Sequence, residues 1–259
     1  MRAVRREAAG RRPVRVPSAV TRDAVPGRRT RTRFEGWIVG TGTASGTRVV
    51  LGHWTRSPFG RFSDVMVERA DGRRLLLAPS RRTADFIAAT YAFDDVEVTP
   101  VDVRVAGRHW QITAGPLDLR LTTGRRGLMG RLLRAVPAPL AARPAWTVLT
   151  YPPARLLLGV RTRGSAGGGR REWYGALDLL PVVSATTVYD GRDQGPLAPV
   201  APPVRFGFGS TPRAPSAVRV VTTVAIPRSS GPRRGPATRT SRGSSRRSRC
   251  RPRRCPSSP

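Results

Sequence analysis

The chain has 259 residues, of which 39% are hydrophobic, and a formal net charge of +31; this is enough apolar material for one sizeable core or two small ones. Histidines apart, every basic residue is an arginine, and the absence of lysine excludes a Walker A lysine, a kinase ATP-site lysine and a Schiff-base lysine. With two histidines and two cysteines the chain cannot build a disulfide scaffold, a cysteine-rich zinc site or an H-E-x-x-H protease site.

The N-terminal segment, residues 1–33, is rich in arginine and shows no helical or strand periodicity. Prolines interrupt it and few of its residues could form a core, so we expect it to be disordered. It lacks the apolar stretch of a secretory signal, and no run of the chain is apolar for long enough to predict a transmembrane helix. The default expectation is a cytoplasmic protein.

A hairpin is predicted at the start of the folded part. The β-prone runs Trp37–Val39 and Arg48–Leu51 flank a turn rich in glycine, threonine and serine, from Gly40 to Gly46. These glycines have the composition of a dinucleotide-binding loop, but a strand follows them where that motif requires a helix N-terminus. We therefore expect a plain turn and no cofactor.

The clearest pattern of the chain runs from Phe62 to Thr122. Its predicted elements are, in order, strand 63–69, a turn at Asp71-Gly72, strand 73–78, helix 81–92 with Ser80 as N-cap, and a meander of three strands between 101 and 122. The helix follows from apolar residues at helical spacing, and the meander from strict alternation of apolar and polar residues. Such alternation is typical of an antiparallel sheet with one solvated face.

The second half of the chain predicts one more helix and further strands. Residues 125–136 are typical of a short basic amphipathic helix, which either packs on the sheet or contacts a membrane surface or polyanion. Strands are predicted at 146–150, 155–163, 171–179, 182–189, 204–208 and 218–224. The proline-rich run 196–203 predicts a stiff surface connection.

The C-terminal segment, residues 227–259, contains only Arg, Ser, Gly, Pro, Ala, Thr and Cys. It cannot bury enough surface to offset the entropy of ordering. It is therefore either a disordered basic tail or an out-of-frame translation of GC-rich DNA. A GC-rich bacterial genome would also account for the use of arginine in place of lysine.

These patterns predict one globular domain over residues 34–226, between disordered basic ends at 1–33 and 227–259. Its class is α+β and β-dominated: an antiparallel sheet or partly closed barrel with two short helices. The sequence does not indicate an oligomeric state.

A first candidate site consists of His53, Asp64 and Glu68, which could serve as acid–base groups. The two carboxylates share one face of a predicted strand. They form an acid pair if that face looks inward, and a solvated edge if it looks outward. The simpler interpretation of His53 is a purely structural role, and His109 is expected on the surface. No set of metal ligands is expected.

A second candidate site follows a glycine-rich loop, Gly164–Gly169, that we expect to be flexible. It consists of Arg170, Arg171, Glu172, Trp173 and Tyr174. A mobile loop beside charged and aromatic side chains suits the mouth of a site for an anionic or aromatic ligand. The alternative is the start of a strand with its aromatic residues in the core.

Three functions remain open from the sequence. The first is binding of a small molecule, anionic or apolar, in a cavity between the sheet, the short helices and the proline-rich connection, with Arg170 or Arg171 and the glycine-rich loop at its entrance; the basic charge favours an anionic group. The second is an enzyme that uses His53 with Asp64 or Glu68. The third is non-specific binding of nucleic acid or another polyanion by the arginine-rich ends, which would neutralise phosphates.

Overall fold

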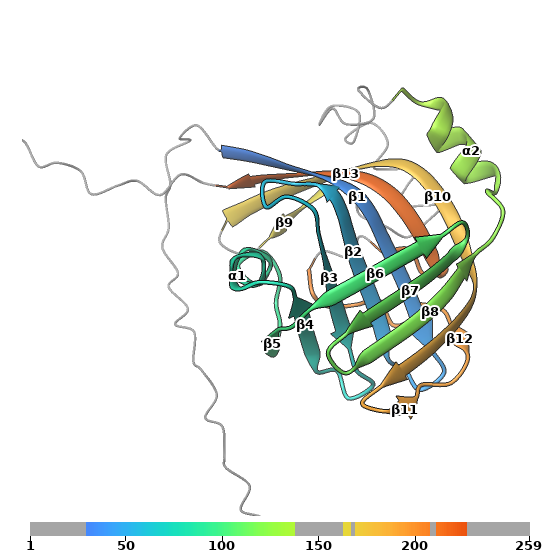
Figure 1. Ribbon diagram of the computed structural model, residues 1–259. Helices are drawn as coiled ribbons and strands as arrows, with labels where there is room; N and C mark the ends of the chain where they lie inside the picture. The colour runs from blue at the N-terminus through green and yellow to red at the C-terminus, as the bar shows by residue number, and fades with distance from the viewer. Residues whose placement is uncertain (1–29, 138–162, 167–168, 208–210, 227–259) are drawn as a thin grey trace, which may run out of the picture. The chain divides into compact units, whose positions relative to one another are not determined.

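The computed structural model describes residues 30–137, 163–166, 169–207 and 211–226 (Figure 1). The elements are β1 (Thr30–Thr43), β2 (Arg48–Arg56), β3 (Phe62–Glu68), β4 (Arg74–Ala78), α1 (Arg81–Ala88), β5 (Asp95–Val98), β6 (Val101–Ala106), β7 (His109–Ala114), β8 (Leu117–Thr123), α2 (Leu128–Ala135), β9 (Arg163–Ala166), β10 (Arg170–Tyr189), β11 (Arg192–Asp193), β12 (Leu197–Ala198) and β13 (Ser216–Ile226). The predicted strand at 146–150, most of that at 155–163, and both chain ends apart from residues 30–33 lie outside the described residues.

The strands form one 13-stranded sheet in the order β5-β4-β3-β2-β1-β13-β10-β8-β7-β6, with β9, β11 and β12 added at its sides. Its pairs are antiparallel except for β4 with β5. In this order β5 and β6 are the two outer strands and do not pair, so the sheet is not closed into a barrel. The predicted class, a β-dominated α+β fold with an antiparallel sheet and two short helices, is confirmed.

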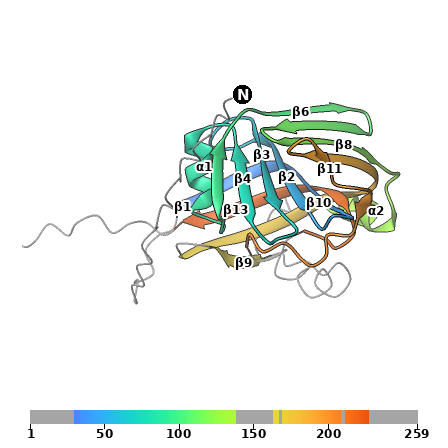
Figure 2. The same cartoon turned by 90° about the horizontal axis from the view of Figure 1, so that it is seen from below.

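The main core lies between two parts of this sheet. β6, β7 and β8 form a layer over β1 to β4, as Figures 1 and 2 show from two directions. Leu51, Val65 and Leu77 from one layer and Ile112 and Leu119 from the other are fully buried in a single cluster. The alternation of β7 and β8 is confirmed, because their apolar residues face this core and their polar residues face away.

The 20-residue strand β10 connects the two layers. Its first half, as far as Pro181, pairs with β13, and its second half, from Val182, pairs with β8. The prediction of two strands, 171–179 and 182–189, is wrong because the backbone continues through Pro181. A proline lacks the N–H that a ladder requires, but Pro181 lies where β10 changes partner, so no continuous ladder is interrupted.

Helix α1 begins as predicted, because the Ser80 side chain accepts a hydrogen bond from the Thr83 N–H (3.3 Å). It ends at Ala88 rather than at residue 92, since the N–H of Ala92 donates to the carbonyl of Phe206 (2.8 Å). The strand β5 follows and was not predicted, because four residues are too few to separate an alternating strand from a loop.

Three further expectations are corrected. β1 begins at Thr30, so residues 30–33, which were expected to be disordered, pair with β13. Residues 204–207 are not in a strand; Val204 and Phe206 are buried in an irregular segment instead. The segment 163–166 is the strand β9, paired with β10, where a flexible loop was expected.

Helix α2 contacts β10, but Gly130 is its buried residue and Leu128 and Leu132 are exposed, so burial of its apolar face on the sheet is not confirmed. A Cβ on Gly130 would lie only 2.2 Å from the carbonyl oxygen of Leu179, so this glycine permits the close approach. Just before the helix, Arg126 donates two hydrogen bonds of 2.7 Å to the buried carboxylate of Asp178. Neither helix of the described part has the length and apolar character that crossing a bilayer requires.

Candidate functional site

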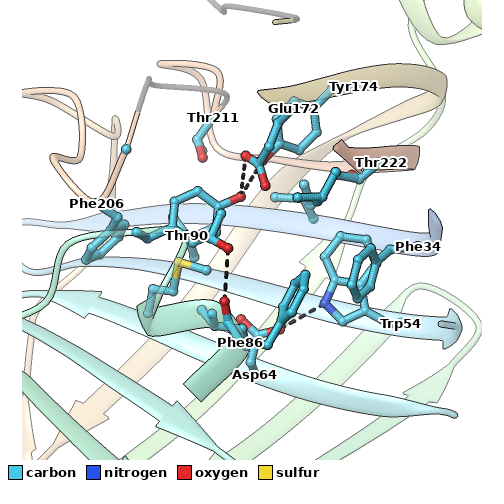
Figure 3. Close-up of a pocket in the computed structure, with 18 of the residues that line it drawn as sticks. Phe34, Trp54, Asp64, Phe86, Thr90, Glu172, Tyr174, Phe206, Thr211 and Thr222 are labelled. Atoms are coloured by element: carbon cyan, nitrogen blue, oxygen red, sulfur yellow. Dashed lines mark hydrogen bonds between the residues drawn. The ribbon is translucent and has the colours of Figure 1, made fainter. Parts of the chain in front are cut away.

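A pocket lies on the face of β1, β2 and β3 that points away from the main core (Figure 3). The alternation of β3 decides this arrangement, because Val65 contributes to the core while Asp64 and Met66 line the pocket. The end of α1 and residues 204–207, which follow the proline-rich run, supply further lining residues. The pocket thus lies between the sheet, the end of α1 and residues 204–207, whereas the proline-rich run 196–203 and helix α2 supply no lining residue.

The pocket has a volume of about 70 Å³ and a mainly apolar and aromatic lining. The larger apolar lining residues are Phe34, Ile38, Trp54, Phe62, Phe86 and Phe206. Its polar lining residues are Asp64, Thr90, Tyr91, Glu172, Tyr174, Thr211 and Thr222. No arginine or histidine is among the described lining residues. The site is therefore apolar with two carboxyl groups.

Asp64 is fully buried in the wall of this pocket. Its Oδ1 accepts a hydrogen bond from the indole N–H of Trp54 (2.9 Å), while its Oδ2 has no hydrogen-bond partner within the described part of the chain. Burial raises the pKa of Asp64 to about 7, although the indole N–H acts in the opposite direction. A carboxyl group whose pKa lies near neutral pH thus belongs to the lining of the pocket, and one of its oxygens has no hydrogen-bond partner among the described residues.

Glycine at position 52 makes the contact between Asp64 and Trp54 possible. Gly52 pairs directly with Asp64 across β2 and β3. A Cβ on Gly52 would lie 2.6 Å from Asp64 Oδ1 and 2.7 Å from Trp54 Nε1. Any side chain there would therefore push the indole and the carboxyl group apart.

The second carboxyl group belongs to Glu172 on β10 and forms a triangle with two tyrosines. The hydroxyl groups of Tyr91 and Tyr174 lie 2.9 Å and 3.2 Å from Glu172 Oε2, and 2.6 Å from each other. Both hydroxyl groups are placed to donate to Glu172 Oε2, and either of them can donate to the other. Burial raises the pKa of Glu172 to about 7, against the opposing effect of the two tyrosines.

The two carboxyl groups approach the pocket from separate places. Asp64 and Glu172 lie on strands between which β2, β1 and β13 intervene, and Figure 3 shows them apart, with Asp64 beside Trp54 and Glu172 beside Tyr174. They therefore do not form a carboxylate pair that shares one proton. Each has its own hydrogen-bond donors.

The predicted group at residues 170–174 is divided by the alternation of β10. Glu172 and Tyr174 line the pocket, whereas Arg171 is exposed and Trp173 half-buried on the other face of the strand. The Arg170 guanidinium donates to the carbonyl of Phe86 (2.8 Å) and to Thr90 Oγ1, and it stacks 4.9 Å from the centre of the Phe86 ring. Arg170 thus links β10 to α1 through these contacts, and it is not among the residues that line the pocket.

The structure does not bring His53 together with a carboxyl group of the pocket. Its Nδ1 lies 2.9 Å from Ser63 Oγ, and its ring meets the edge of Trp110 in the main core at 5.9 Å. Asp64, next to Ser63 on β3, points to the opposite face. Burial, and then the charge of Arg61, lower the pKa of His53, which favours its neutral form.

Glu68 is on the same face of β3 as Asp64 but has two cationic partners. Its Oε1 lies 3.1 Å from Nη2 of the buried Arg48 and 2.8 Å from Nε of Arg205, and its Oε2 accepts the backbone N–H of Arg205 (2.7 Å). The face that carries both carboxyl groups looks inward, but Glu68 is held in an ion-pair network and is not among the lining residues.

Sequence reasoning missed Phe34, Trp54, Tyr91 and Thr222 as lining residues. Tyr91 was predicted on the apolar face of a helix, which does contact the sheet, but nothing in the sequence indicated its bond to Glu172. Thr222 Oγ1 is a second buried polar atom of the pocket without a hydrogen-bond partner among the described residues. These contacts join strands and loops far apart in the chain, so no local spacing could indicate them.

In the described ranges, no group of three or more His, Cys, Asp or Glu side chains is placed to hold a metal ion. No known protein family matches the sequence, and no curated protein is similar to it. Among solved structures, the fold is similar to that of acetoacetate decarboxylase from Legionella pneumophila subsp. pneumophila str. Philadelphia 1, with a TM-score of 0.36 and 10% identity, covering 78% of this chain and 90% of that one. This similarity is too low to indicate a family or a function.

Proposed function

We propose that this protein binds a small, mainly apolar molecule in the pocket over β1, β2 and β3. The observation that carries the proposal is a free, fully buried carboxyl oxygen, Oδ2 of Asp64, in the wall of an aromatic pocket. An unsatisfied buried polar atom costs about 1–3 kcal/mol. A ligand with a hydrogen-bond donor would remove this cost and fill the apolar space at the same time.

The size of the pocket limits the ligand. A volume of about 70 Å³ is roughly half that of the 150 Å³ apolar cavity that accommodates benzene. The body of the ligand is therefore a short branched chain or a single small ring, and anything larger extends through the open side of the pocket. A long fatty acid does not fit inside.

The lining also bears on the charge of the ligand. The sequence favoured an anionic group because the chain is basic, but Asp64 and Glu172 line the pocket and no arginine does so in the described residues. A carboxylate ligand would bring a charged group into an apolar space whose described lining offers it no cationic partner. An apolar ligand with a donor group is the better match.

A thermal-shift and calorimetry panel tests the proposal. Isobutanol and 1-propanol represent apolar bodies with a donor, and isobutyrate and propionate are their anionic counterparts. We expect the alcohols to raise the melting temperature, because a ligand at 100 times its Kd stabilises the folded state by about 2.7 kcal/mol. Tighter binding of the acids would instead support the anionic alternative.

A variant that fills the pocket tests whether the ligand binds there. Val50 lines the pocket and is buried, whereas Val105 on β6 is exposed. We expect Val50→Phe to abolish the shift and Val105→Phe to preserve it, with circular dichroism as the check that both fold. No shift with any small molecule, or an unchanged shift in Val50→Phe, would refute the proposal.

A further inference from the structure

The inference concerns the charge of the ligand and rests on the proposed function. Both acidic groups of the pocket, Asp64 and Glu172, are buried, and the described lining has no cationic side chain. Buried carboxyl groups in proteins are usually paired with a cation or fully hydrogen-bonded. Among the described residues one oxygen of Asp64 has neither, although Glu68 on the same strand is paired with Arg48 of β2 and with Arg205. The missing partner of Asp64 is a cation or a strong donor.

The aromatic rings beside Asp64 also favour a positively charged ligand. Phe34 lies at the centre of a cluster, with ring centres 5.6 Å from Trp54, 5.3 Å from Phe86 and 6.5 Å from Phe62. The faces of such rings carry negative potential and attract cations. One ring of this cluster already carries a guanidinium group, since Arg170 stacks on Phe86 (4.9 Å). A small ammonium ion on the pocket side would meet the same attraction.

We propose that the ligand is a small apolar amine that binds as its ammonium ion and donates a hydrogen bond to Asp64 Oδ2. The apolar body occupies the space between the sheet and α1, and the rings around Phe34 surround the charged group. An ammonium ion matches three features of the pocket at once: the free oxygen, the acidic lining and the aromatic cluster. A neutral alcohol satisfies only the first of them.

The chemistry of Asp64 adds a measurable consequence. Because burial holds its pKa at about 7, Asp64 is mostly protonated at pH 6, while a simple aliphatic ammonium is fully charged. Pairing with the ammonium favours the ionised carboxylate, so binding should release close to one proton. Of the other charged groups, Glu172 is bonded to Tyr91 and Tyr174, Arg170 to α1, and Arg48 to Glu68.

An amine and an alcohol that share the same apolar body distinguish the amine proposal from the proposed function. We expect isobutylamine to bind wild-type protein about tenfold more tightly than isobutanol, since a charge-assisted hydrogen bond is roughly twice as strong as a neutral one. Asp64→Asn should remove this preference, because a neutral amide cannot form a charge-assisted hydrogen bond with the ammonium group. Asp85→Asn, which removes an exposed carboxylate of α1 outside the pocket, should leave the preference intact.

Proton release is measured on the wild-type protein and does not depend on a variant that folds. Calorimetry of isobutylamine at pH 6, in buffers that differ in ionisation enthalpy, should show nearly one proton released per amine bound. Binding of isobutanol without any preference for the amine, or amine binding without proton release, would overturn the amine proposal and leave the proposed function standing. If no probe binds at all, both fail.

Discussion

Asp64 and Glu68 lie on the same face of β3 and are both fully buried, but only Glu68 is paired with arginine. Glu68 Oε1 lies 3.1 Å from Arg48 and 2.8 Å from Arg205, whereas the side chain of Asp64 has, within the described ranges, the indole N–H of Trp54 at 2.9 Å as its hydrogen-bond partner. Because both carboxyl groups lie on one strand, their different pairing with arginine is not due to a shortage of arginine. The unpaired carboxyl group is the one that lines the pocket, which is the expected arrangement where a ligand supplies the partner.

Asp64→Asn should stabilise the protein above neutral pH. The folded pKa of about 7 exceeds the ordinary value of 3.8, so between these values the folded state holds more protons than the unfolded state. Stability from this group is therefore full below pH 4, falls as pH rises towards 7 and stays low above it. Asparagine does not titrate, so we expect a gain of at most about 4 kcal/mol at pH 8.

Urea unfolding of the wild type and Asp64→Asn at pH 4 and pH 8 measures this difference. The two proteins should have similar free energies of unfolding at pH 4 and separate at pH 8. Asp85→Asn again provides the exposed control, with little change at either pH. Equal free energies at pH 8 would show that Asp64 is not held protonated by its surroundings.

Glu68→Gln should destabilise the protein severely. The change would leave the buried Arg48 guanidinium without its counter-charge, and breaking a buried ion pair from one side costs roughly 3–5 kcal/mol. Glu35→Gln is the matched control, because Glu35 pairs with Arg33 and Arg56, both well exposed; such pairs contribute about 1 kcal/mol or less. Denaturant unfolding of both variants at pH 7 checks the ranking, which a loss below 1 kcal/mol for Glu68→Gln would contradict.

Tyr91→Phe should raise the pKa of Glu172 further. The hydroxyl of Tyr91 lies 2.9 Å from Glu172 Oε2 and favours the ionised carboxylate; without it, ionisation becomes more costly. A carbon-detected NMR titration of the glutamate side chains would measure a pKa above 7. Tyr189→Phe, on the same strand as Glu172 but outside the pocket, should not change it; a fall in the Tyr91→Phe variant would contradict the assignment.

A chain that starts at Phe34 should be less stable than one that starts at Thr30. Residues 30–33 pair with residues 223–226 of β13, and Thr32 Oγ1 also donates to the carbonyl of Val224 (3.0 Å). Loss of a few such hydrogen bonds costs about 2 kcal/mol, at 0.5–1.5 kcal/mol each. Differential scanning calorimetry of the spans 30–226 and 34–226 tests this. Equal melting temperatures would show that this end of β1 contributes nothing.

If the full chain binds nucleic acid, removal of residues 1–29 and 227–259 should abolish that binding. These arginine-rich ends would neutralise phosphates and release counterions, so binding of the full chain should be insensitive to sequence and fall steeply with salt. Fluorescence anisotropy with one duplex in 50 and 200 mM salt compares the full chain with residues 30–226. Salt-resistant binding by the shorter chain would place a nucleic-acid site in the folded part instead.

Local patterns were sufficient for most of the fold. The alternation around Trp110 and Leu119, the Asp71-Gly72 turn and the Ser80 cap each depend on neighbours within a few residues, and all three were predicted from the sequence. The wrong predictions concern places where a contact with a distant segment of the chain determines the local structure. The bond of Ala92 to Phe206 ends α1 early, and the change of partner at Pro181 allows one strand where two were expected.

For the site, the sequence by itself determined which chemistries are absent and which faces could carry polar groups. The lack of lysine and the shared face of Asp64 and Glu68 follow from residue identity and from the two-residue period of a strand. Only the tertiary structure decided that Glu68 meets arginines and that Asp64 meets a pocket. The reason is physical: charge neutralisation and burial depend on side chains such as Arg205 and Tyr91, which come close only when the sheet and its covering segments assemble.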